Sequence, residues 1–256
     1  MGGRRKFGVS KPVLNKIKAF IFGLSDAMLR IPQKELREPL YVNKNNKGKS
    51  IQKGKGKGKA YLTADAISLS LLRLKTWSAV SDQFGYESHV HGEAAVAAAL
   101  VACIRYCSPE DDIFIATPHR VQREAVRSAL GRLKIPQPDN PLEKSFGKLS
   151  ITDGLENVTV DTIERLQGSS EASFVICLFS LPDSYLNDLG FLLERRRLNV
   201  AISRAKNLCV LVTSSQVLCP PVTVFSNEQT AKGFAFLKAY EDRAWSCDLS
   251  VNIDDV

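Results

Sequence analysis

The sequence has no apolar run long enough to cross a membrane and carries no targeting signal that we can identify. No stretch reaches the roughly 18 consecutive apolar residues that a transmembrane helix needs. The basic N-terminus, Met1-Gly2-Gly3-Arg4-Arg5-Lys6, is not followed by an apolar segment with a cleavage site, and Gly2 has no Ser or Thr after it at the myristoylation position. These absences predict a protein that neither enters a membrane nor is anchored to one.

The six cysteines are few and scattered, and they form no metal-binding pattern. Cys103 and Cys107 lie four residues apart on a predicted helix, but no second Cys or His pair accompanies them, so we predict no metal site. Cys177 and Cys209 lie in apolar runs, where a thiol behaves as a small apolar side chain. Because this pattern suits a reducing compartment, we expect a nuclear or cytoplasmic protein.

Charge is distributed unevenly over the 256 residues. Residues 1–86 contain 18 Lys and Arg but 5 Asp and Glu, a net charge of +13, whereas the remainder has a net charge of −5. Residues 43–59 are almost entirely Lys, Gly and Asn, which predicts a disordered linker. A basic segment attracts nucleic acid through phosphate charge, without reading its sequence. We therefore divide the chain into a basic, partly disordered extension (1–86), an α/β domain (87–220) and a helical tail (221–256).

Apolar patterns predict the elements of the central domain. Short apolar runs predict buried strands at 112–117, 158–163, 174–180 and 208–213. Helical spacing predicts helices at 93–106, 122–133 and 190–205, with others at 11–31, 61–77 and 228–245. Strands that alternate with helices predict a parallel sheet with helices on both faces.

The segment 195–206, R-R-R-L-N-V-A-I-S-R-A-K, is the most informative part of the chain. Three adjacent arginines repel one another unless an anion faces them, and their planar donor groups suit phosphate. Arg204 lies seven positions after Arg197, so both can project to one side of a helix. A surface helix with solvated arginines is the alternative.

Three segments resemble, in order, motifs of superfamily 1 helicases of the Upf/Dna/Sen-like branch. Residues 196–206 resemble motif VI, R-R-L-N-V-A-[LI]-[ST]-R-A-[KR]; residues 162–171, T-I-E-R-L-Q-G-S-S-E, resemble motif V, [ST]-[VI]-[DE]-x-[FM]-Q-G-x-E; and residues 113–122, I-F-I-A-T-P-H-R-V-Q, resemble motif IV, an apolar strand followed by T-P-Y-x-x-Q. Two departures stand out. Both Ser169 and Ser170 precede Glu171 where the family has one residue, and His119 replaces a common Tyr.

The resemblance covers about residues 88–218 and implies the second, C-terminal RecA-like domain of an ATP-dependent helicase, a parallel sheet of the P-loop NTPase type. It implies that Arg204 is the catalytic arginine finger that approaches the γ-phosphate. It further implies a set of ligand contacts: Glu171 with the ribose of ATP, Gln167 and Gly168 between the nucleotide and the nucleic-acid track, Arg197 with motif V or the phosphates, and Thr117 and Thr162 with nucleic acid. Because ligands of such sheets bind at the carboxyl ends of strands, we expect the three motifs to converge on one edge.

The first half of such a motor is missing from the sequence. It contains no G-x-x-x-x-G-K-[ST] phosphate loop and no acidic Mg²⁺-binding motif; Gly48-Lys49-Ser50 imitates the end of that loop, but Asn43 stands where its first Gly belongs. We therefore expect Mg²⁺ and the phosphate loop to come from a first RecA-like domain, upstream or on another chain, single-stranded RNA or DNA to be the partner, and this chain to be inactive alone. Two alternatives remain: a degenerate module that binds nucleic acid or protein without turnover, and an unrelated α/β protein.

Overall fold

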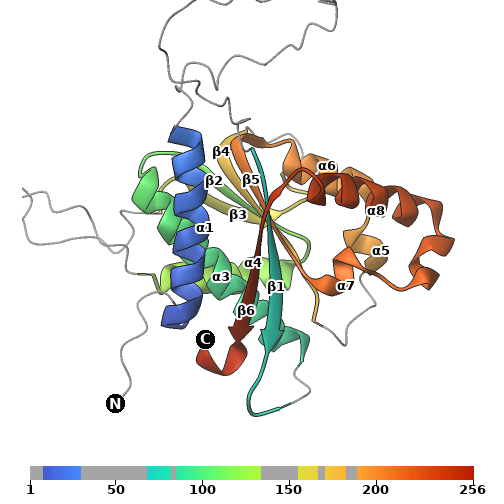
Figure 1. Cartoon of the computed structure of the whole chain (residues 1–256), viewed down its shortest axis with the longest axis horizontal. Helices are drawn as coiled ribbons and strands as arrows, with labels where there is room; N and C mark the ends of the chain where they lie inside the picture. Colours follow the sequence, from blue (N-terminus) through green and yellow to red (C-terminus); the bar gives the residue numbers. More distant parts are fainter. Residues whose placement is uncertain (1–7, 30–67, 82–84, 134–154, 167–170, 183–188) are drawn as a thin grey trace, which may run out of the picture.

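The computed structural model describes residues 8–29, 68–81, 85–133, 155–166, 171–182 and 189–256. These residues form one sheet of six parallel strands with helices on both faces (Figure 1). The strand order is β3-β2-β4-β5-β1-β6, and the bounds are β1 Leu69–Trp77, β2 Ile113–Thr117, β3 Val158–Thr162, β4 Ala172–Phe179, β5 Ala205–Thr213 and β6 Trp245–Asn252. The predicted α/β class with a RecA-like parallel sheet is therefore confirmed. The predicted linker lies outside the described residues.

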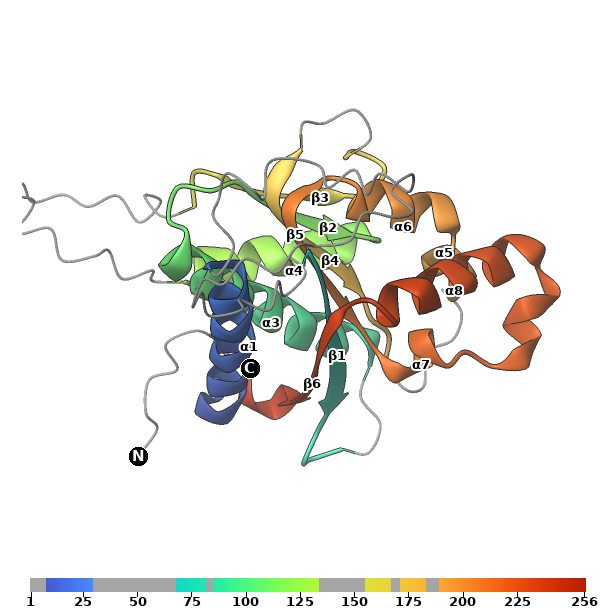
Figure 2. The same ribbon diagram turned by 45° about the horizontal axis from the view of Figure 1, so that its top comes forward.

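Helices cover both faces of the sheet because its central strands send apolar side chains to both sides. In β5, Val210 and Val212 belong to one apolar cluster, while Cys209 and Leu211 between them belong to the other. The first cluster is covered by three helices, α1 Lys11–Leu29, α3 Tyr86–Cys107 and α4 Arg120–Gly131. The second is covered by four, α5 Leu189–Leu192, α6 Arg195–Ile202, α7 Ser215–Leu218 and α8 Glu228–Glu241. Figure 2 shows these two groups of helices on either side of the strands.

The Ala-rich helix α3 is the centre of the first face. Within the described ranges it alone is long and apolar enough to cross a membrane. However, 83% of its apolar 18-residue stretch is buried inside the protein, as in a core helix. The amphipathic helix predicted near the N-terminus is present as α1 and packs on α3 through Val13, Ile17 and Phe20. The basic extension therefore contributes to the core.

The prediction of a helix over residues 61–77 is wrong, because residues 69–77 form the strand β1. Leu71 lies in one apolar cluster, and Leu72 and Leu74 lie in the other, so the strand is buried on both faces. The alternation of apolar and polar residues changes phase between Leu71 and Leu72, and the leucines also fall at helical spacing. β1 pairs with β5 on one side and β6 on the other.

The C-terminal region 221–256 is not only helical. The predicted last helix ends at Glu241 rather than residue 245, and the edge strand β6 and the 3₁₀ helix η3 (Ile253–Asp255) follow; a further 3₁₀ helix, η2 (Val222–Ser226), precedes α8. Tyr240 on α8 donates its hydroxyl to the carbonyl oxygens of Ser70 and Cys209, 3.0 Å from each. The sheet thus takes strands from both sides of the interval 87–220.

The motif VI helix is shorter than predicted. Residues 190–205 contain the short helix α5, a turn and then α6, and Ala205 already belongs to β5. The strand that we predicted to begin at residue 208 therefore begins three residues earlier. Cys177 and Cys209 are buried as predicted, with their sulfur atoms 3.9 Å apart, and no disulfide is present in the described part, which includes all six cysteines.

Candidate nucleotide and nucleic-acid sites

The predicted site residues lie at two opposite edges of the sheet. All six strands are parallel, so the sheet has one edge where strands end, the carboxyl edge, and one where they begin, the amino edge. Thr117 and Thr162 are paired at the ends of β2 and β3, whereas Glu171 and Arg204 directly precede the paired residues that open β4 and β5. The expectation that the three motifs converge on one edge is therefore met only in part, because Glu171 of motif V and Arg204 of motif VI lie at the amino edge. The two described ends of motif V, Thr162 and Glu171, lie at opposite edges, and α6 lies between the same two edges.

At the amino edge, motifs V and VI are joined through the main chain. The N–H of Ala172 donates to the carbonyl oxygen of Arg204 at 3.0 Å, which sets the residue after Glu171 against Arg204. Glu171 is exposed, and Arg204 is half-buried. A carboxylate and a guanidinium just before the starts of two neighbouring strands fit the ribose hydroxyls and phosphates of a nucleotide. Gln167 and Gly168 lie outside the described residues.

At the carboxyl edge, the two predicted nucleic-acid threonines are buried. Thr117 donates its hydroxyl to the carbonyl oxygen of Asp161 at 3.3 Å, and its own carbonyl accepts from the N–H of Ile163 at 3.1 Å. The residues Thr117 and Thr162 are 0% and 7% exposed, so both side chains lie inside the protein. These threonines fix the turns that follow β2 and β3.

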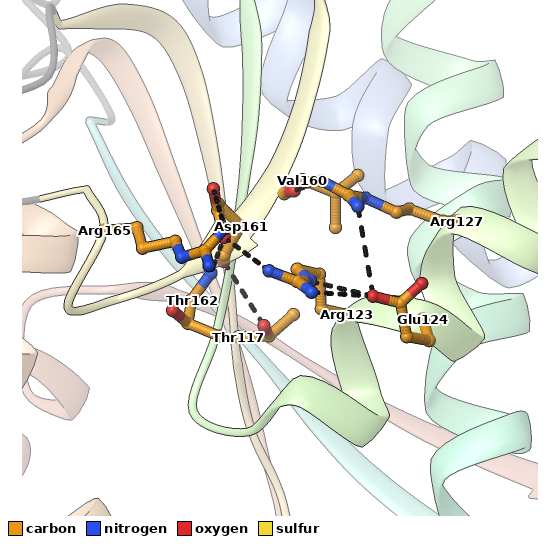
Figure 3. A network of polar contacts seen from close by, with 8 residues as sticks. All are labelled: Thr117, Arg123, Glu124, Arg127, Val160, Asp161, Thr162 and Arg165. Atoms are coloured by element: carbon orange, nitrogen blue, oxygen red, sulfur yellow. Dashed lines mark hydrogen bonds and ion pairs between the residues drawn. The ribbon is translucent and has the colours of Figure 1, made fainter.

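A polar network between α4 and β3 surrounds these turns (Figure 3). The Asp161 carboxylate accepts from Arg123 at 3.2 Å and from the N–H of Thr162 at 2.8 Å, and it lies 4.0 Å from Arg165. Arg127 donates to the carbonyl oxygen of Val160 at 3.0 Å. Partial burial acts to raise the pKa of Asp161, but the two hydrogen bonds and the two arginines hold it below its usual value. The residue after motif IV, Arg123, is thus tied by charge to the residue before motif V, Asp161.

Arg197 connects all three motifs at the same edge. Its guanidinium pairs with Glu164 of motif V at 3.1 Å and with Glu194, and its central carbon lies 3.7 Å from the centre of the Phe191 ring. The His119 ring of motif IV stacks on Phe191 with centres 4.8 Å apart. This arrangement favours the first of the two roles left open for Arg197, which is to hold motif V.

Helix α8 fixes the position of the chain that leads into α6. A Cβ atom at Gly233 would lie 1.5 Å from the carbonyl oxygen of Leu193 and 3.2 Å from the backbone nitrogen of Arg195. Only a glycine allows this approach, because real Cβ atoms essentially never come within 3.0 Å of another heavy atom. The sequence motifs did not reveal this contact, since it joins segments about forty residues apart.

A buried polar chain lies beneath motif IV, and the sequence analysis missed it. The Glu93 carboxylate accepts from the Ser180 hydroxyl at 2.5 Å and from the Gln122 side-chain amide at 2.7 Å. The His89 ring lies 2.9 Å from the Ser180 hydroxyl and 2.7 Å from that of Thr76. Burial raises the pKa of Glu93 to about 7, against the hydrogen bonds from Ser180 and Gln122, and burial lowers the pKa of His89 to about 4. The available signal was an acidic residue inside an Ala-rich core helix.

Among the described residues, no group of three or more His, Cys, Asp or Glu side chains is placed to hold a metal ion.

Comparisons with known proteins agree with the motifs. The model of the "AAA domain" family AAA_12 matches residues 36–216, well over half of the chain. The chain is 27% identical over 112 residues to "Putative helicase mov-10-B.2" of Danio rerio, which covers 42% of this chain and 10% of that protein. It is 29% identical over 129 residues to "Putative ATP-dependent RNA helicase ECM32" of Saccharomyces cerevisiae, which covers 43% of this chain and 11% of that protein. The matched segment is therefore about a tenth of these relatives' length.

Among solved structures, one titled "XPD_Helicase" aligns with 70% of this chain and 36% of that one, at 12% identity and a TM-score of 0.31. The fold assignment rests on the parallel sheet itself. The family assignment rests on the family model and on motifs IV, V and VI. The chain belongs to the AAA_12 family, a superfamily 1 helicase family of the Upf/Sen-like type.

Proposed function

We propose that this chain is the second RecA-like domain of a superfamily 1 helicase, with a nucleotide contact at its amino edge and a nucleic-acid contact at its carboxyl edge. The observation that carries the proposal is the separation of the motif residues into these two sets. Glu171 and Arg204 meet at the starts of β4 and β5, while the ends of β2 and β3 lie at the opposite edge. One domain then has distinct surfaces for the two ligands.

Arg204 is the residue that we assign to the γ-phosphate. A guanidinium placed against the transferring phosphoryl group stabilises the charge that develops on its oxygens, and in other nucleotide hydrolases it contributes about 10³–10⁵ in rate. Glu171, beside it, is assigned to the ribose. Bound Mg²⁺ would neutralise phosphate charge, and its ligands, like the phosphate loop, are assigned to a first RecA-like domain upstream or in trans. The role of this chain is to place Arg204.

The carboxyl edge carries the exposed positive charge that nucleic-acid binding needs. Arg195 and Arg196 are exposed in the first turn of α6, next to the Arg197–Glu164 pair. Arg120 is exposed at the first residue of α4, and the Arg165 side chain is 60% exposed. Backbone phosphates are bound by such arginines without sequence readout. Because Thr117 and Thr162 are buried, we now assign phosphate contact to the arginines and structural support to the threonines.

The proposal is tested by reconstitution. ATP hydrolysis is measured for this chain, for a first RecA-like domain of a related helicase, and for their mixture, each with single-stranded RNA or with DNA of the same length. We expect turnover in the mixture only. Turnover by this chain alone that is lost in Arg204→Ala would show that the motor is complete here. Salt-sensitive binding of single strands without turnover in any mixture would favour the non-catalytic module instead. RNA is the first ligand to test, since one matched relative is titled an RNA helicase.

A further inference from the structure

Two hydrogen bonds fix the orientation of the Gln122 side-chain amide. Its Oε1 accepts from the backbone N–H of His119 at 3.2 Å, and its Nε2 donates to the Glu93 carboxylate at 2.7 Å. Reversing the amide would set two donors against each other at His119 and leave two acceptors facing each other at Glu93. Gln122 is 1% exposed, so water does not relieve either mismatch. Glu93 therefore decides which end of Gln122 meets the motif IV turn.

Glu93 is itself held so that this contact survives a change in its charge. Its other oxygen faces the Ser180 hydroxyl at 2.5 Å and the Ser180 N–H at 3.3 Å. When Glu93 is ionised, Ser180 donates to it and His89 donates to Ser180. When Glu93 is protonated, it can donate to Ser180, and Ser180 then donates to His89 in its other tautomer. In both cases the oxygen that faces Gln122 remains an acceptor.

Within the described part of the chain, the groups that hydrogen-bond to the Glu93 carboxylate are polar and uncharged. Gln122 comes from α4, Ser180 follows β4, and His89 reaches the network through Ser180 from the same helix as Glu93. Beyond His89, the chain ends on Thr76 of β1. Burial raises the pKa of Glu93 and the hydrogen bonds from Ser180 and Gln122 lower it, and no charged group is among the causes of its shift. Glu93 is thus not half of an ion pair that would explain its presence in the core.

We propose that Glu93 is a positioning residue for the nucleic-acid contact of motif IV, acting through Gln122 on the backbone turn at His119. This inference rests on the proposed function of the carboxyl edge. The turn that Gln122 fixes joins β2 to α4, places His119 against Phe191, and leads directly into exposed Arg120. Glu93 touches neither ligand, so its effect is on the placement of groups that do.

The test is an exchange of the two side chains. In Gln122→Glu, two carboxylates face each other in a dry site, so one must take up a proton or move. In the double variant Glu93→Gln with Gln122→Glu, the amide at 93 accepts from Ser180 and donates to the carboxylate at 122, which still accepts from His119. The double variant therefore restores every hydrogen bond of the wild type. The single variant Glu93→Gln keeps the contact with Gln122 by presenting its oxygen to it, while its amide nitrogen donates to the Ser180 hydroxyl and the Ser180 N–H loses its acceptor.

Binding is measured by fluorescence anisotropy of a labelled oligouridine with the full chain, from pH 6 to pH 8.5. We expect Gln122→Glu to bind about tenfold more weakly at pH 8.5, the effect of losing one charge-assisted hydrogen bond, and to recover toward the wild type at pH 6. Glu93→Gln and the double variant should stay within about twofold of the wild type at both pH values.

Three outcomes would overturn the proposal. The first is that Gln122→Glu binds as tightly as the wild type at pH 8.5. The second is that the double variant binds as weakly as Gln122→Glu. The third is that Gln122→Glu has an unchanged Kd and that only the fraction of protein able to bind is lower. The last result would mean that the network only stabilises the fold.

Absence of salt-sensitive RNA binding by the wild type would instead contradict the proposed function. The positioning role is then tested by hydrogen exchange of the His119 N–H, which should be faster in Gln122→Glu and restored in the double variant. Unchanged exchange in Gln122→Glu would refute it.

Discussion

The two edges of the sheet are built differently. At the carboxyl edge, side chains join the motifs and the residues beside them: Asp161 binds Arg123, Arg197 binds Glu164, and His119 stacks on Phe191. At the amino edge, the link that we describe between motifs V and VI is a main-chain hydrogen bond from Ala172 to Arg204. Main-chain links survive side-chain substitution. Changes at the amino edge should therefore act on chemistry, and changes at the carboxyl edge on both structure and binding.

The largest expected effect is at the amino edge. Arg204→Ala should lower ATP turnover of the chain reconstituted with a first RecA-like domain by about 10³ or more, because the charge on the phosphoryl group loses its guanidinium. The main-chain hydrogen bond from Ala172 to Arg204 is kept in this variant, and a melting-temperature measurement checks that the fold is retained. Arg132→Ala, an exposed arginine at the end of α4, is the control and should leave turnover unchanged. Equal turnover in both variants would remove Arg204 from the chemistry.

The next effect concerns the contact between α8 and the chain that leads into α6. Gly233→Ala should lower the free energy of unfolding by about 3 kcal/mol or more, because the new methyl group overlaps the Leu193 carbonyl and α8 must shift. Gly190→Ala is the matched control: a Cβ at Gly190 meets nothing within 4 Å, so the change should be under about 1 kcal/mol. Urea denaturation measures both. Similar losses in the two variants would contradict the close approach of α8.

The buried network at the carboxyl edge should show itself in the pH dependence of stability. The pKa of Glu93 is about 7 in the folded protein against an ordinary value of 4.5, so the folded state binds a proton between these values that the unfolded state does not. Stability from this group therefore rises as pH falls from 7 to 4.5, by about 3 kcal/mol. Glu93→Gln should lack this gain.

Lowering the pH has the opposite effect on His89. Its folded pKa is about 4 against 6.5, so its contribution to stability falls as pH falls from 6.5 to 4. The two contributions largely offset each other in the wild type, and Glu93→Gln should reveal the loss from His89. Urea denaturation across pH 4.5–7 measures this difference. If the difference in free energy of unfolding between the wild type and Glu93→Gln did not change over this pH range, Glu93 would not titrate within it.

The smallest effects should come from the exposed arginines of the carboxyl edge. Arg196→Ala and Arg165→Ala should each weaken RNA binding severalfold, about 1 kcal/mol, and each should reduce the slope of log affinity against log salt by about one. Anisotropy titrations at several salt concentrations give both quantities, with Arg132→Ala again as control. If the slope were unchanged in both variants, the nucleic acid would have to bind at a surface other than the carboxyl edge.

The sequence predicted the elements whose patterns are strong. The strands predicted at 112–117, 174–180 and 208–213 are present as β2, β4 and β5, with bounds that differ by up to three residues. β1 was missed because its apolar–polar alternation changes phase between Leu71 and Leu72, which places its leucines at helical spacing. β6 was missed because it is an edge strand in which Leu249 and Val251 are buried between exposed residues, a short pattern next to a strong helical one.

The motifs were recognised, but their division between two edges was not. The information was present in the sequence: a helix followed directly by a parallel strand delivers its last residues to the amino edge, whereas Thr117 follows the end of a strand. The network of Glu93 could not be predicted in the same way. It depends on α3, α4 and the end of β4 meeting in space, and no local pattern encodes that meeting.

The placement of α6 has a mechanical consequence. The helix has eight residues, a length of about 12 Å, and a helix of this length is stiff along its axis. Its first turn is anchored at Glu164 and Phe191, and Arg204 lies two residues beyond its last turn. A displacement imposed on the first turn by a bound strand must therefore be absorbed in residues 203–204 or be passed on to Arg204. The two proposed ligand surfaces thus lie at opposite ends of α6.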